Sequence, residues 1–184
     1  MTTAKKLLTA DDLLAMPDDG KRYELIRGVL ITMAPASAPH GAVTDRIGRR
    51  IGNFVEANDL GKTYAAETGV FIEHGPDTVR APDYAFTSHE RIAGASLSSG
   101  YSEIIPDLVV EVIAGDYRSS VVDTKTRMWL DAGVRLVVVA YVASTELIAH
   151  HADGTVQRFG PGDTLSCEPV LPGFACTVDE IFAY

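Results

Sequence analysis

Hydrophobic positions follow two different patterns along the chain. From His40 to about Asn58, apolar residues recur at spacings of three and four, which predicts an amphipathic helix. Residues 107–113 and 135–141 are instead nearly continuous runs of β-branched and other apolar residues, which is typical of strands buried on both faces. A helical pattern over residues 119–132 separates these two runs. The order strand, helix, strand predicts a parallel βαβ crossover.

The other strands are predicted in pairs. Tyr23–Ile26 and Val29–Met33 flank a glycine-containing turn and predict a hairpin. Glu67–Glu73 and Ala81–Thr87 flank the turn-rich residues 74–77, so we expect a second hairpin there. Later β segments, separated by Gly- and Pro-containing turns, are expected to form antiparallel hairpins near the C-terminus.

Short helices are predicted at both ends of the chain. Thr9 followed by two aspartates predicts a helix that ends near Pro17, and Thr177 predicts the start of a last helical turn. Together the elements predict one α/β domain over residues 1–184, with a flexible start over residues 1–8. It has a mixed central β-sheet flanked by helices and a β-rich C-terminal tail.

The composition agrees with a single globular domain. Of 184 residues, 46% are hydrophobic and 22% are charged, and Gly and Pro show no period. Two cysteines are too few for a disulfide framework or a four-cysteine zinc site, so a reducing cytoplasm is the expected location. No apolar run reaches the roughly 18 residues of a membrane span, and the start lacks the pattern of a signal peptide.

The charge balance restricts the partners of the protein. The net charge is −9, so a polyanion would need a local basic face or metal ions to bind. Arg46, Arg49 and Arg50 stand at i, i+3 and i+4 on the long predicted helix and share a face. That face is either an ordinary solvated surface or a set of phosphate contacts.

A carboxylate inside a buried strand is the most informative feature of the sequence. Glu111 interrupts an apolar run, and such a charge is costly unless it is paired or bound to a cation. Asp83 follows Pro82 at the start of another predicted strand, and the two carboxylates can converge if these strands pair. An oxygen-rich pair of this kind suits Mg²⁺ or Mn²⁺. Lys125, on the helix after Glu111, could reach the same point.

These residues carry a resemblance to known nucleases. Pro82-Asp83, Glu111 in a β-branched strand and a later lysine resemble the PD-(D/E)XK nuclease superfamily, although Ile113 stands at the usual lysine position. The wider pattern resembles the Uma-type family of restriction endonuclease-like proteins, in which the following helix is thought to supply the lysine. The matching residues are Arg22-Tyr23-Glu24-Leu25-Ile26 with Gly28, His40, Glu67-Thr68-Gly69, Arg80 with Pro82-Asp83, Pro106 to Val112, Lys125, and Gly133-Val134.

The resemblance implies a fold and a set of roles. It implies a restriction endonuclease-like core in which Asp83, Glu111 and the backbone carbonyl of Val112 ligate Mg²⁺, with no organic cofactor. Lys125 would position the attacking water. Glu24 would complete the site, or would instead be an edge-strand carboxylate in a salt bridge. His40 would contact a phosphate or water, or would only cap the long helix.

Two functions from different classes remain open at this point. The first is a metal-dependent DNA endonuclease, acting as a homodimer whose two basic faces form a cleft. The second is a non-catalytic nuclease-fold protein that serves in binding or as a scaffold. The net charge and the departures from the family pattern over residues 114–121 favour the second. The two are distinguished by whether Asp83, Glu111 and Lys125 meet within about 5 Å around an oxygen-lined pocket that can hold a six-coordinate ion.

Overall fold

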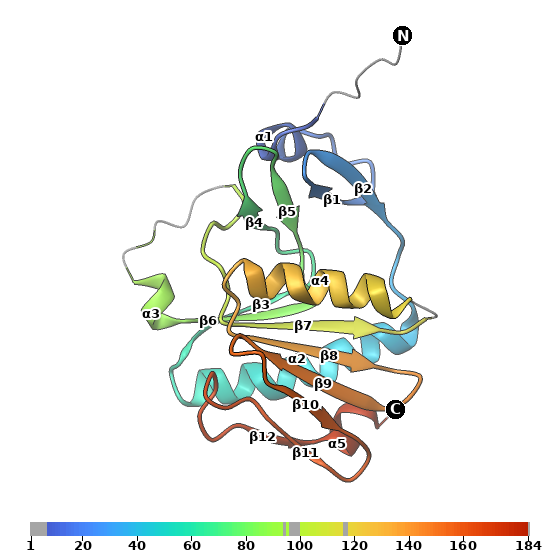
Figure 1. The fold of residues 1–184 in the computed structure, drawn as a ribbon, viewed down its shortest axis with the longest axis vertical. Helices are drawn as coiled ribbons and strands as arrows, with labels where there is room; N and C mark the ends of the chain where they lie inside the picture. The colour runs from blue at the N-terminus through green and yellow to red at the C-terminus, as the bar shows by residue number, and fades with distance from the viewer. Residues whose placement is uncertain (1–6, 94, 96–99, 116–117, 184) are drawn as a thin grey trace.

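The computed structural model describes residues 7–93, 95, 100–115 and 118–183, which form three β-sheets and five helices (Figure 1). Most of the flexible start predicted for residues 1–8 lies outside the described residues. So do residues 116–117, which belong to the segment 114–121 that departs from the family pattern. Every helix in the described part of the chain is too short or too polar to cross a bilayer. The predicted mixed α/β architecture is confirmed.

The central sheet has six strands in the spatial order β10-β9-β8-β7-β6-β3. β7 and β8 are parallel and are joined by α4 (Ser119–Asp131), which confirms the predicted crossover, and the other neighbours are antiparallel. The strands are β3 (Gly61–Ala65), β6 (Tyr84–Ser88), β7 (Leu108–Ile113), β8 (Leu136–Tyr141), β9 (Glu146–His151) and β10 (Val156–Phe159).

Helices cover both faces of this sheet. On one face, apolar side chains of α2 (Ala38–Ala57), including Ile47 and Ile51, pack with Val110 and Val112 of β7. On the other face, Trp129 of α4 packs in a second cluster with residues of β7 and β8. Fully burying one such side chain contributes about 1.5–3 kcal/mol. Burial on both faces accounts for the continuous apolar runs of β7 and β8.

A smaller four-stranded sheet lies beyond α4 and carries α1 (Ala10–Leu14) at its outer side (Figure 1). The capping box at Thr9 confirms the predicted helix start. The spatial order of the strands is β2-β1-β5-β4. Their bounds are β1 (Arg22–Ile26), β2 (Val29–Met33), β4 (Val70–Glu73) and β5 (Thr78–Arg80).

The second predicted hairpin is wrong in its partners. β4 pairs with β5, but β6 pairs with β3 and β7 in the central sheet, and β3 was not predicted. The chain leaves the small sheet after Arg80 and enters the central sheet at Tyr84. Pro82 lies in this crossing and has no N–H to donate to a ladder, so one continuous strand is interrupted there.

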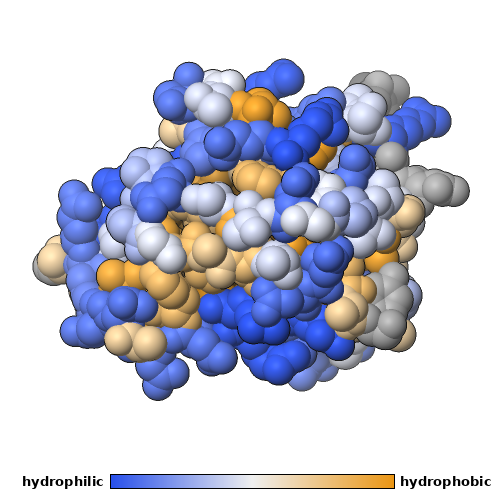
Figure 2. All heavy atoms as spheres, turned by 90° about the horizontal axis from the view of Figure 1, so that it is seen from below, coloured by the Kyte–Doolittle hydropathy of each residue, from blue (hydrophilic) through white to orange (hydrophobic). Residues whose placement is uncertain are grey.

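The C-terminal tail closes the side of the core that α2 faces. β11 (Thr164–Ser166) pairs with β12 (Ala175–Thr177), and α5 (Val178–Phe182) packs against α2. Viewed from this end, the surface has apolar side chains near its centre and a mainly polar margin (Figure 2). The short helix α3 (His89–Ile92) follows β6. Cys176 is buried as expected, and burial raises its pKa to about 11.

Candidate active site

The pairing of β6 with β7 places the two predicted carboxylates next to each other. Tyr84 pairs with Val110 in an antiparallel register, so Asp83, one residue before β6, faces the level of Glu111. The backbone N–H of Val112 donates a hydrogen bond to Oδ2 of Asp83 at 2.7 Å. The predicted strand pairing is confirmed.

Glu111 is a buried carboxylate with a partner on each oxygen. Nζ of Lys125 lies 2.6 Å from Oε2, and Nε1 of Trp129 donates to Oε1 at 2.8 Å. Both partners come from one face of α4, four residues apart. Burial raises the pKa of Glu111; attraction to Lys125 opposes this shift and repulsion from Asp83 adds to it, so the pKa stays above its ordinary value.

Asp83 has the opposite electrostatic behaviour. Its burial would raise its pKa, but hydrogen bonds from His40 and from the Val112 N–H outweigh burial and hold the pKa below its ordinary value. Nε2 of His40 lies 3.2 Å from Oδ2 of Asp83. In the described part of the chain, Oδ1 of Asp83 has no hydrogen-bond or ion-pair partner. Two neighbouring carboxylates with pKa values pushed apart are typical of catalytic sites.

A pocket of about 360 Å³ opens beside these groups, and Asp83, Glu111, Lys125 and His40 all line it. Arg22 and Arg80 supply the other charged side chains of the lining, which therefore has three basic and two acidic residues, counting histidine as neutral. Each of the three basic side chains pairs with a carboxylate, Arg22 with Glu67, Arg80 with Glu24 and Lys125 with Glu111, so the pocket brings basic groups to the carboxylates without an excess of positive charge.

The donor chemistry fits a small divalent cation. Among the described residues, no group of three or more His, Cys, Asp and Glu side chains can enclose a metal ion. Mg²⁺, however, is commonly held by one or two carboxylates and completes its shell with water and substrate phosphate oxygens. Asp83 and Glu111 provide two hard oxygen donors, and the charge of a cation would offset the repulsion between them.

Glu24 lies beside the pocket rather than in its lining. Its Oε2 is 3.1 Å from Nε of Arg80, and its Oε1 accepts a hydrogen bond from the Ala81 N–H at 3.1 Å. Both side chains are buried, at 5% and 11% exposure. These contacts favour the salt-bridge interpretation of Glu24. Glu24 and Arg80 also line a neighbouring pocket of about 240 Å³ that Asp83 and Lys125 share.

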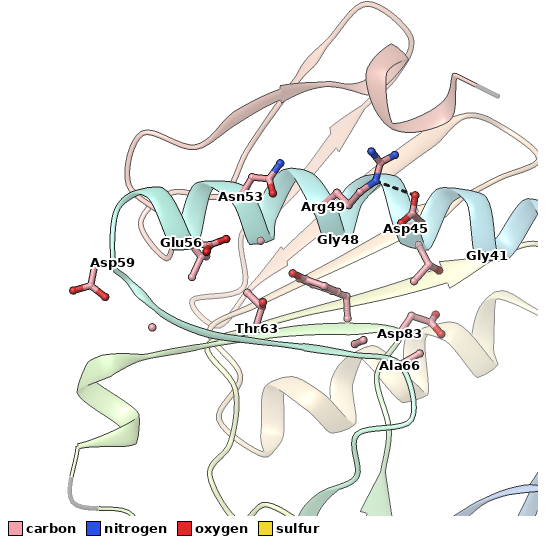
Figure 3. A pocket seen from close by; sticks show the side chains of 16 residues that line it. Gly41, Asp45, Gly48, Arg49, Asn53, Glu56, Asp59, Thr63, Ala66 and Asp83 are labelled. Atoms are coloured by element: carbon pink, nitrogen blue, oxygen red, sulfur yellow. Dashed lines mark hydrogen bonds and ion pairs between the residues drawn. The ribbon is translucent and has the colours of Figure 1, made fainter.

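The three arginines of α2 lie away from this pocket. Arg49 pairs with Asp45 at 3.0 Å and faces a groove of about 640 Å³ between α2 and β3 (Figure 3). Arg50 pairs with Glu180 of α5 at 3.1 Å. Arg46 is half-buried. The structure therefore does not gather them at the carboxylates, and their contact with DNA stays a prediction.

Sequence reasoning gave no site role to three residues that surround the carboxylates. Trp129 follows Lys125 by four positions and so shares its helix face, from which its Nε1 donates to Glu111. Arg22 precedes Glu24 by two positions on one strand, which places both side chains on the same side of the sheet. Arg80 lies three residues before Asp83. Helical and strand periodicity were the signals that could have found the first two.

The sheet order, the crossover helix and the paired carboxylates define a restriction endonuclease-like α/β protein. A family model, Uma2, described as "Putative restriction endonuclease", matches residues 10–179, and the chain belongs to this family. It is also similar to the structure titled "Crystal structure of a putative nuclease belonging to DUF820 from Anabaena variabilis ATCC 29413". That match has a TM-score of 0.79 and 17% identity and covers 95% of this chain and 97% of the other, which shows a shared fold. No curated protein matches the sequence.

Proposed function

We propose that the protein is a metal-dependent endonuclease that hydrolyses phosphodiester bonds in DNA. The observation that carries this proposal is the convergence of Asp83, Glu111 and Lys125, from separate segments of the chain, on one pocket that Arg22 and Arg80 also line. Membership in a family described as "Putative restriction endonuclease" and the fold shared with the Anabaena variabilis structure support this class of reaction.

Each side chain has a role that follows from its contacts. Asp83, Glu111 and the Val112 carbonyl would hold Mg²⁺ or Mn²⁺, which supplies a water of lowered pKa and stabilises charge on the phosphate. Lys125, held by Glu111, places an ammonium where negative charge develops. His40 and the Val112 N–H fix one oxygen of Asp83, so the other is directed to the pocket.

A homodimer is part of the proposal. A duplex is far larger than one pocket of about 360 Å³, and two such pockets on one assembly would bring more basic side chains to an anionic duplex than one pocket does. Sedimentation equilibrium with and without DNA measures the stoichiometry. A monomer in both conditions would remove this part of the proposal.

The central experiment compares wild type with Glu111→Gln. We expect calorimetry to detect Mg²⁺ or Mn²⁺ binding by the wild type and not by the variant, and the nicking of supercoiled plasmid to be lost with it. Glu56→Gln, a matched change in the α2 groove, should keep both activities because Glu56 lies outside the pocket. Metal binding without nicking would support the metal site and exclude plasmid DNA as its substrate.

A non-catalytic binding or scaffold role is the second candidate. It is favoured by the ion pair at 2.6 Å, in which Lys125 already neutralises Glu111 without any cation. On this view neither Mg²⁺ nor Mn²⁺ should bind the wild type in the calorimetric experiment.

A further inference from the structure

Arg80 is an arginine held inside the protein at the point where the chain passes from the small sheet to the central sheet. Its side chain is 11% exposed, and its Nε lies 3.1 Å from Oε2 of Glu24. Both of these atoms are inaccessible to solvent. Because buried guanidinium and carboxylate groups are rarely tolerated unpaired, this contact explains why Glu24 is buried.

The two terminal nitrogens of Arg80 are different. They have no hydrogen-bond partner among the described residues, and neither of them is among the buried polar atoms that lack a partner, so both are reached by solvent. Arg80 lines both pockets that meet at Asp83 and Lys125. A guanidinium has five N–H donors in a planar fork whose geometry matches phosphate oxygens. The outer donors of this fork are therefore available to a ligand in the pocket.

The other cations of the pocket are already engaged. Arg22 pairs with Glu67 at 3.1 Å, and Lys125 pairs with Glu111 at 2.6 Å. Among the basic residues that line this pocket, Arg80 thus keeps the largest set of uncommitted donors.

Glu24 anchors the inner end of this guanidinium. One of its oxygens accepts a hydrogen bond from the Ala81 N–H, and the other forms an ion pair with Nε of Arg80, so the carboxylate lies between the backbone and the guanidinium. A donor that is oriented before the ligand arrives loses less conformational entropy on binding.

We infer that Arg80 binds a phosphate group of the nucleic-acid strand at the Asp83 and Glu111 pocket, and that Glu24 is a positioning residue for Arg80. This inference rests on the proposed function and deepens it. It assigns to the guanidinium a part of the substrate affinity that the arginines of α2 were expected to carry.

The test measures affinity for a labelled 20-base-pair duplex DNA in Ca²⁺, over a series of NaCl concentrations. Ca²⁺ takes oxygen ligands in looser geometry than Mg²⁺, so binding can be followed apart from hydrolysis. We expect Arg80→Ala to weaken binding about tenfold or more, as for one charge-assisted hydrogen-bonded contact. The slope of log affinity against log salt should fall by about 0.9, the value for one phosphate contact. Arg158→Ala, on the exposed edge strand β10, should change neither quantity.

Arg80→Ala leaves the buried Glu24 without a cation and could fail to fold, so Arg80→Lys serves as a second variant that keeps a positive charge beside Glu24. An ammonium carries all its donors on one nitrogen, and when that nitrogen pairs with Glu24 no outer N–H groups remain for a phosphate. We therefore expect Arg80→Lys to lose nearly as much DNA affinity as Arg80→Ala. Wild-type affinity and salt slope in Arg80→Lys, with a native melting temperature, would overturn the inference.

Glu24→Gln tests the positioning role. Removing one negative charge would by itself strengthen DNA binding, so a rise in KM with unchanged calorimetric Mg²⁺ affinity is the signature of a misdirected guanidinium. Unchanged or lower KM would overturn the role of Glu24, and weakened Mg²⁺ affinity would indicate a metal ligand instead.

The outcomes separate the inference from the proposed function. Wild-type nicking that Arg80→Lys retains at wild-type KM overturns only the inference. A wild-type protein that binds no DNA overturns both.

Discussion

Asp83 lies between the groove along α2 and the pocket beside β7, and the chemistry of these two hollows differs. The groove between α2 and β3 has about 640 Å³ and is lined by four acidic side chains and one basic side chain (Figure 3). The pocket beside β7 has about 360 Å³ and is lined by three basic and two acidic side chains. For a polyanionic substrate, the balance of charge selects the smaller hollow over the larger one.

The largest expected effect lies on the pocket side, at Lys125. Replacing it with Met should reduce plasmid nicking by a factor of about 100 or more, because a donor that stabilises transition-state charge is typically worth that much. Mg²⁺ binding should persist, since removing the ammonium leaves more negative charge on the carboxylates. Arg127→Met, on the exposed side of the same helix, should keep near wild-type rates. Equal loss in both variants would mean that α4 matters only as a scaffold.

The floor of the groove is sensitive to packing rather than to charge. A Cβ on Gly48 would lie 2.8 Å from ring atoms of Tyr84, whereas a Cβ on Gly41 meets nothing within 4 Å. Gly48→Ala should therefore destabilise the protein by about 1–3 kcal/mol, and Gly41→Ala, on the same helix, should be neutral or slightly stabilising. Urea denaturation monitored by circular dichroism measures both. Equal stability of the two variants would show that Tyr84 moves aside freely.

Two arginines in similar surface ion pairs allow a matched comparison of the two hollows. Arg22 pairs with Glu67 at 3.1 Å in the pocket, and Arg49 pairs with Asp45 at 3.0 Å in the groove. Arg22→Ala should weaken DNA binding several-fold, while Arg49→Ala should change it by less than about twofold, because nearby carboxylates repel phosphates from the groove. Fluorescence anisotropy with labelled duplex measures both. A larger loss of DNA affinity in Arg49→Ala than in Arg22→Ala would indicate that the arginines of α2 contact the DNA.

The smallest expected effect is a pH dependence of stability. Burial holds the folded pKa of Glu111 above its unfolded value, so the ionised side chain costs stability at pH values above the unfolded pKa, and this cost grows as pH rises through the folded pKa. In EDTA at pH 7, Glu111→Gln should melt at the same temperature as the wild type or up to about 4 °C higher. The difference should shrink as pH falls toward about 4 and vanish below it, as Glu111 becomes protonated in both states. If Glu111→Gln melts below the wild type at pH 7 but not at pH 4, the predicted direction of this pH dependence is wrong.

The central part of the fold was predictable because its signals are local. The apolar runs of β7 and β8, with a helical pattern between them, specify a parallel crossover with few alternatives. Glu111 stood out because one carboxylate in such a run demands a partner or a cation, and Lys125 was expected near it, although their direct ion pair was not predicted. Asp83 followed from the expected pairing of two strands.

The division of the strands between two sheets was not predictable in the same way. Gly61–Ala65 carries a weak strand pattern and gains its place only by pairing with β6. The pairing of Glu24 with Arg80 joins β1 to β5, whose side chains meet across a sheet that the sequence did not predict. The charge difference between the hollows also depends on which side chains the sheets bring together.

The register of β6 on β7 has a consequence for the synthesis of the protein. Asp83 meets Glu111 only when strands from separate stretches of the chain have paired, and the side-chain partners of Glu111 come later still, on α4. A nascent chain on the ribosome therefore has no assembled cluster until Trp129 has left the exit tunnel and the sheet has closed. The activity proposed above would be absent from the chain while it is being made.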